Sequence, residues 1–155
     1  MSEQAPPANF TRADGSAVSM KDLVGNKTIV LYFYPKDDTA GCTAEACSFR
    51  DSYEDFKAAG AEVIGVSADD GSSHEAFKQK NRLPFTLLSD PGGAAAKAFG
   101  VKKTFGLIAG RVTFVIDRQG AIRHKFDSQI RVNKHVEEAL AVVKSLEQPA
   151  PEAKA

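Results

Sequence analysis

Two cysteines, Cys42 and Cys47, stand five residues apart in a chain that contains no others. The polar stretch before Cys42 reads as a loop and the residues after it show a helical period, so Cys42 is expected to open a helix. At that place free backbone N–H groups and the positive end of the helix dipole favour a thiolate, which predicts a nucleophile. The alternative is a small apolar side chain packed beneath the helix, which is the commoner role of an isolated free thiol.

Structural zinc is not expected, because such a site normally needs four ligands. The three histidines, His74, His124 and His135, lie far along the chain from the cysteines and have no paired spacing. We interpret His74 as a first-turn helix residue and the other two as surface residues, none of them catalytic. No metal or other cofactor is predicted. Two cysteines are also too few for a secreted scaffold held by disulfides.

The strongest strand signal is a continuous β-branched and aromatic run from Thr28 to Tyr34, typical of a central strand covered on both faces. Pro35 ends it, and a polar connection leads into a helix predicted from Cys42 to Ala59. A capping box, Ser72 to Glu75, predicts the start of the next helix. The remaining predicted elements are a hairpin within 8–17, strands at 62–68, 84–88, 111–116 and 121–126, and helices at 72–80, 93–99 and 132–146.

Alternating strands and helices followed by a hairpin and a last helix predict an α/β fold. We expect a mixed central sheet with helices on both faces and an N-terminal hairpin, and the best match is a thioredoxin-like fold. One domain is expected over residues 1–155, with loose tails at 1–7 and 147–155. Active sites in such sheets lie beyond the C-terminal ends of parallel strands, where the loop 35–41 is placed.

The two thiols point apart on the predicted helix. Cys42 shares its apolar face with Ala46 and Phe49, whereas Cys47 shares the solvated face with Arg50. Five residues of helix separate the two Cα atoms by about 8–9 Å, but a disulfide usually needs less than about 7 Å. Either the cysteines never pair, or pairing requires the first turns of the helix to unwind.

The composition argues against several partners. Twenty Lys and Arg residues balance twenty Asp and Glu residues, so nothing draws the chain to nucleic acid or to an anionic membrane surface. The longest apolar run, 28–34, is far shorter than a membrane span. The N-terminus lacks the pattern of a secretory signal, which predicts a cytoplasmic protein, or a chloroplast or other organellar protein after removal of a transit peptide.

The spacing Pro35-x-x-x-Thr39-x-x-Cys42 resembles the active-site motif of the peroxiredoxins. The likeness extends from Pro35 to Asp51 and is closest to the peroxiredoxin Q, or bacterioferritin comigratory protein, subgroup. Similar segments follow at 72–77, 83–90 and 111–117.

The resemblance implies a thiol peroxidase that reduces hydrogen peroxide and organic hydroperoxides without metal, haem or flavin. Cys42 would be the peroxidatic cysteine, and Cys47 the resolving cysteine that forms an intramolecular disulfide with it. Thr39 would hold the peroxide oxygens, and Arg111 would stabilise the thiolate and the leaving oxygen. By the same likeness, Glu45 would hydrogen-bond the arginine, and Pro35 would limit water at the sulfur.

The resemblance also implies recycling by thioredoxin or a similar dithiol, and we expect a monomer. Preference among hydroperoxides would depend on the pocket depth around Phe33, Phe85 and Phe105. Two alternatives use the same cysteine pair: a redox sensor, and a disulfide oxidoreductase of the thioredoxin type, although the latter normally carries Cys-x-x-Cys.

Overall fold

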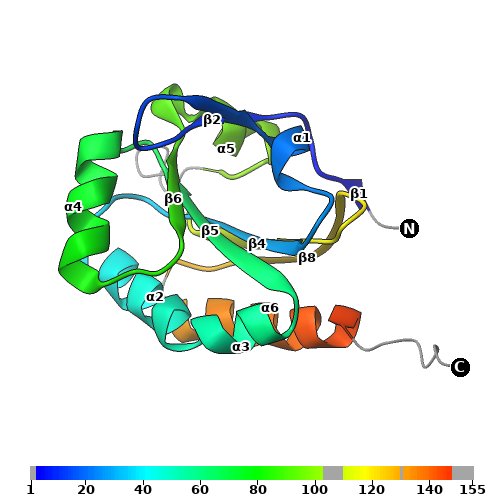
Figure 1. Cartoon of the computed structure of the whole chain (residues 1–155). Coiled ribbons are helices and arrows are strands. Elements are labelled where there is room, and N and C mark those ends of the chain that lie inside the picture. Colours follow the sequence, from blue (N-terminus) through cyan, green and yellow to red (C-terminus); the bar gives the residue numbers. More distant parts are fainter. Residues whose placement is uncertain (1–2, 103–109, 130, 148–155) are drawn as a thin grey trace, which may run out of the picture.

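A mixed sheet forms the centre of the protein, as seen in a computed structural model that describes residues 3–102, 110–129 and 131–147 (Figure 1). Within these residues the sheet has eight strands in the order β1-β8-β7-β4-β5-β6-β2-β3. β4, β5 and β6 run parallel, and the other pairs are antiparallel. In chain order the strands are β1 (Glu3–Gln4), β2 (Asn9–Thr11), β3 (Ala17–Ser19), β4 (Thr28–Phe33), β5 (Ala61–Ser67), β6 (Thr86–Ser89), β7 (Val112–Ile116) and β8 (Ala121–Asp127).

Helices cover both faces of this sheet, as predicted (Figure 1). One core contains residues of α2, α3, α4 and α6, and the other contains residues of α1, α5 and the N-terminal hairpin. Successive residues of β4 alternate between the two cores, which explains why that strand is apolar throughout. The helices are α1 (Met20–Leu23), α2 (Ala40–Asp51), α3 (Tyr53–Ala58), α4 (Gly71–Asn81), α5 (Ala94–Ala98) and α6 (Val132–Glu147), with a short 3-10 helix at Pro91–Gly93.

The strand order brings three separate segments to one edge of the sheet. The C-terminal ends of the parallel strands β4 and β5 lie side by side, so the loops that follow them are neighbours. β7 runs antiparallel to β4, with Val112 opposite Phe33. Arg111, directly before β7, therefore lies beside the end of β4, where the loop toward Cys42 begins.

Two predicted helix boundaries are wrong. The helix expected from Cys42 to Ala59 begins two residues earlier, at Ala40, and is divided at Ser52, whose φ and ψ of −102° and 4° are not helical. The expected capping box at 72–75 does not start α4. Asp70 caps that helix instead, because its carboxylate accepts a hydrogen bond from the Ser73 N–H, and the first helical residue is Gly71.

The expected loose tail at residues 1–7 is wrong for Glu3 and Gln4, which pair with Ile122 and Ala121 at the edge of the sheet. This pairing uses backbone groups and needs no apolar side chain, so composition does not reveal it. At the other end α6 continues to Glu147, and the rest of the expected tail lies outside the described residues. None of the described helices is long and apolar enough to cross a membrane.

Candidate active site

Cys42 is the third residue of α2, and only 1% of its surface is exposed. The first intrahelical hydrogen bond runs from the Thr43 N–H to the Thr39 carbonyl. The N–H groups of residues 40–42 therefore lie in the part of a helix that offers them no intrahelical acceptor. Both cysteines are free thiols. The structure thus confirms the buried position of Cys42 at the start of a helix, where an anion is favoured.

The guanidinium of Arg111 lies against the Cys42 thiol, although the two residues are far apart in the sequence. Its Nη1 donates to Glu45 Oε1 at 2.7 Å, and its Nε donates to the Gln129 carbonyl at 3.1 Å. Burial lowers the pKa of Arg111, but the neighbouring Glu45 and Cys42 outweigh this effect and raise the pKa above its ordinary value. A fixed, buried cation therefore faces the sulfur.

Gly41 gives the arginine its place at the helix. A Cβ on this residue would lie 3.0 Å from Arg111 Nη2, closer than ordinary van der Waals contact. The guanidinium therefore packs directly over the backbone of the first turn of α2, beside Cys42.

Glu45 is completely buried one turn after Cys42, and it anchors Arg111 by the short ion pair already described. Burial raises the pKa of Glu45 to about 7, while the Arg111 guanidinium opposes that rise. Its second oxygen, Oε2, accepts no hydrogen bond from the described residues. The nearest ring nitrogen, His135 Nδ1, lies 3.6 Å from it.

The expectation of surface positions for two histidines is wrong. His135 is fully buried, with Nδ1 2.7 Å from the Thr113 hydroxyl and Nε2 2.7 Å from the Ser128 carbonyl. The side chain of His124 is 18% exposed. A signal was present for His135, because it precedes Ala139 by four residues on the apolar face of α6.

Thr39 and Pro35 lie on the loop between β4 and α2. Thr39 is the exposed N-cap residue of α2, but its hydroxyl makes no capping bond and donates instead to the Lys36 carbonyl at 2.9 Å. Pro35 is half-buried directly after Tyr34. The oxygen of Thr39 keeps its lone pairs available as acceptors.

Cys47 lies on another side of α2 and contacts α4. Its thiol is half-buried 3.8 Å from Asn81 Oδ1, and Arg50 Nη1 donates to the Asn81 carbonyl at 2.8 Å. The predicted solvated face is therefore partly covered by the end of α4. Both cysteines are on one continuous helix, so the expected Cα separation of about 8–9 Å applies.

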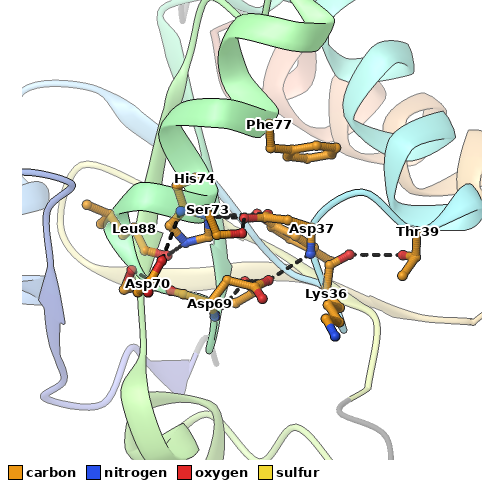
Figure 2. A network of polar contacts seen from close by, with 12 residues as sticks. Lys36, Asp37, Thr39, Asp69, Asp70, Ser73, His74, Phe77 and Leu88 are labelled. Atoms are coloured by element: carbon orange, nitrogen blue, oxygen red, sulfur yellow. Dashed lines mark hydrogen bonds and ion pairs between the residues drawn. The ribbon is translucent and has the colours of Figure 1, made fainter.

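A second polar cluster, missed by the sequence reasoning, surrounds Asp37 on the same loop (Figure 2). It joins Asp37 to Asp69 after β5 and to Ser73 and His74 in the first turn of α4. His74 is 1% exposed. The signal was topological, since loops after neighbouring parallel strands must meet.

The expected substrate pocket around Phe33 and Phe85 is not found, because these side chains are buried in the cores on opposite faces of the sheet. Phe105 lies outside the described residues. A hollow of about 130 Å³ is present beside the Asp37 loop, against α4. Its lining residues are Asp37, Asp38, Ser73, Ala76, Phe77 and Lys80. Within the described part of the chain, no group of three or more His, Cys, Asp or Glu residues could hold a metal ion.

Comparison with known proteins gives consistent results. A family model described as the AhpC/TSA family matches residues 1–125. The chloroplastic peroxiredoxin Q of Suaeda salsa is 52% identical over 149 residues, which are 94% of this chain and 69% of that protein. The one from Populus jackii is 50% identical over 145 residues, which are 92% of this chain and 68% of that protein.

Solved structures show the same fold. Peroxidoxin BcpB of Mycobacterium tuberculosis is 31% identical with a TM-score of 0.86, and the match covers 94% of this chain and 96% of that one. For peroxiredoxin Q of Xanthomonas campestris the values are 31%, 0.82, 91% and 92%. These similarities confirm the predicted thioredoxin-like fold.

Proposed function

Since the chain belongs to the AhpC/TSA family and is a two-cysteine thiol peroxidase of the peroxiredoxin Q type, we propose that Cys42 is its peroxidatic cysteine and Cys47 its resolving cysteine. The enzyme reduces hydroperoxides and is returned to its dithiol form by a thiol reductant. The observation that carries the assignment is the buried Arg111 guanidinium, fixed by Glu45, against the thiol at the start of α2.

In the first step the Cys42 thiolate attacks the terminal oxygen of the hydroperoxide. A sulfur–oxygen bond forms, the oxygen–oxygen bond breaks, and the alkoxide or hydroxide that leaves takes up a proton. Arg111 stabilises negative charge first on sulfur and then on the leaving oxygen. The N–H groups at the start of α2 and the Thr39 oxygen hold the peroxide, while half-buried Pro35 limits water at the sulfur.

In the second step the Cys47 thiol condenses with the Cys42 sulfenic acid, which forms a disulfide and releases water. About 8–9 Å of intact helix separates the two Cα atoms, more than the roughly 7 Å limit of a disulfide. The first turns of α2 must therefore unwind, and the contact of Cys47 with Asn81 must break. We propose thioredoxin or a similar dithiol as the reductant that then exchanges with the exposed disulfide.

Consumption of hydrogen peroxide in the presence of thioredoxin, its reductase and NADPH tests the proposal. The wild-type chain should turn over many times, Cys42→Ser should not react, and Cys47→Ser should react once per chain. Reaction of wild type only once per chain would instead match the redox-sensor alternative. Undiminished turnover in Cys42→Ser would refute the assignment.

We also propose that the protein acts as a monomer in the cytoplasm, or in an organelle such as the chloroplast. The chloroplastic names of its relatives support the second location. Light scattering on the reduced protein measures the oligomeric state. A mass near twice the 16.6 kDa of the chain would contradict the monomer.

A further inference from the structure

A buried carboxylate lies in the loop before Cys42 and has no part in the proposed chemistry. Asp37 is 6% exposed and accepts three side-chain hydrogen bonds, from the Tyr34 hydroxyl, the Ser73 hydroxyl at 2.8 Å and His74 Nδ1 at 2.7 Å (Figure 2). Burial raises the pKa of Asp37, but the hydrogen bonds from His74 and Tyr34 outweigh it and lower the pKa below its ordinary value. The carboxylate is therefore ionised.

His74 is held between two acceptors. Nδ1 faces the Asp37 carboxylate, and Nε2 lies 3.0 Å from the Leu88 carbonyl on β6. A carbonyl oxygen and an ionised carboxylate both require a donor, so each ring nitrogen carries a hydrogen and His74 is an imidazolium. The ion pair between Asp37 and His74 thus ties the loop after β4 to α4 and to β6.

The peptide group between Lys36 and Asp37 is fixed at both of its polar ends. Its N–H donates to Asp69 Oδ2 at 2.7 Å, and that same oxygen accepts a hydrogen bond from the Ser67 hydroxyl. Its carbonyl accepts the hydroxyl hydrogen of Thr39 at 2.9 Å, as Figure 2 shows. Because a peptide group is planar, the anchors on Asp37 also set the direction of the Lys36 carbonyl.

The direction of this carbonyl decides how Thr39 can meet a substrate. A hydroxyl has a single hydrogen, and here it points at Lys36, so the oxygen of Thr39 is left as an acceptor. The terminal oxygen of a hydroperoxide carries a hydrogen that it can donate. A bond to Thr39 would hold that oxygen before the Cys42 sulfur and direct the leaving oxygen toward Arg111.

We propose that Asp37 and His74 are positioning residues for the peroxide step: they fix the Lys36–Asp37 peptide so that the Thr39 hydroxyl accepts the hydrogen of the hydroperoxide. The proposal rests on the proposed function, because it takes Cys42 as the nucleophile. Its distinctive consequence is that Asp37 acts on the rate through Thr39.

A double-mutant cycle tests this consequence. The second-order rate of Cys42 oxidation by hydrogen peroxide is measured in wild type, Asp37→Asn, Thr39→Val and the double variant, with the thermal midpoint as a measure of folding. Asp37→Asn should slow oxidation about tenfold when Thr39 is present and less than twofold when valine replaces it. The peroxide affinity seen at saturation should weaken together with the rate, because the lost contact is to substrate.

Asp90→Asn is the matched control. Asp90 is also a buried carboxylate, 3% exposed, but it accepts from the Ala95 and Ala96 N–H groups at the start of α5 and has no link to Thr39. It should lower stability and leave the oxidation rate within twofold of wild type. If Asp37→Asn does not fold, Ser73→Ala removes one hydrogen bond of the cluster and takes its place in the cycle.

Equal slowing by Asp37→Asn in both backgrounds would overturn the proposal, because the residue would then serve the fold alone. An unchanged rate in Thr39→Val would overturn it too. Failure of the underlying function would look different, since Cys42→Ser would then still consume peroxide.

Discussion

Gly41→Ala should separate the stability of this protein from its activity. The added Cβ would lie 3.0 Å from Arg111 Nη2, so the guanidinium must move by a few tenths of an ångström. That group is 5% exposed and is held by Glu45 and the Gln129 carbonyl, and therefore it cannot swing away freely. The shift should cost about 1.4 kcal/mol in the transition state, or a tenfold slower oxidation of Cys42.

The stability of the same variant should change little. Alanine is favoured over glycine in a helix by about 1 kcal/mol, and the strained contact costs a similar amount. The free energy of unfolding should therefore stay within about 1 kcal/mol of wild type. The chain has no tryptophan, so the oxidation is best followed by quenching with an alkylating reagent and measuring intact mass.

Ala58→Gly is the matched control, because Ala58 is exposed in α3 and lies outside α2. It should lose about 1 kcal/mol of stability and keep the wild-type oxidation rate. A Gly41→Ala protein that is oxidised as fast as wild type would refute the argument that the arginine must sit against this backbone.

Three further predictions concern Glu45, Cys47 and α2. Burial raises the pKa of Glu45 to about 7 from an ordinary value of 4.5, so the folded state keeps a proton that the unfolded chain loses. The stability of wild type relative to Glu45→Gln should thus fall by roughly 1–3 kcal/mol as the pH rises from 4.5 to 7; a constant difference in urea denaturation would contradict this. Cys47→Ser should lose turnover with thioredoxin and pass more readily to the sulfinic acid, as mass spectrometry measures. Unchanged turnover would make Cys47 a spectator. On oxidation of wild type, amides 42–50 should lose hydrogen-exchange protection while β4 and β7 keep it; equal protection in both states would exclude unwinding.

Local sequence patterns predicted the elements better than the contacts between them. The run 28–34 could be read as a doubly covered strand, because each residue carries its own apolar signal. The same holds for the amphipathic period of α6. The break at Ser52 has no glycine or proline to mark it, and the pairing of Glu3 and Gln4 depends on an open strand edge that only the folded sheet provides.

The candidate site was predicted where a motif carries it and missed where topology creates it. Cys42, Glu45 and Arg111 come together as the resemblance implied. The cluster around Asp37 joins residues more than 30 positions apart, so no local pattern contains it. His74 precedes the buried Phe77 by three residues, a helical spacing that could have indicated its burial.

The most direct test of the central claim is to trap the sulfenic acid with dimedone and identify the labelled cysteine by peptide mass spectrometry. Cys47→Ser treated with one equivalent of hydrogen peroxide should carry the label on Cys42, and Cys42→Ser treated in the same way should carry none. A label on Cys47 in the Cys42→Ser protein, at the rate seen for Cys42, would contradict the assignment of Cys42 as the atom that receives the peroxide oxygen.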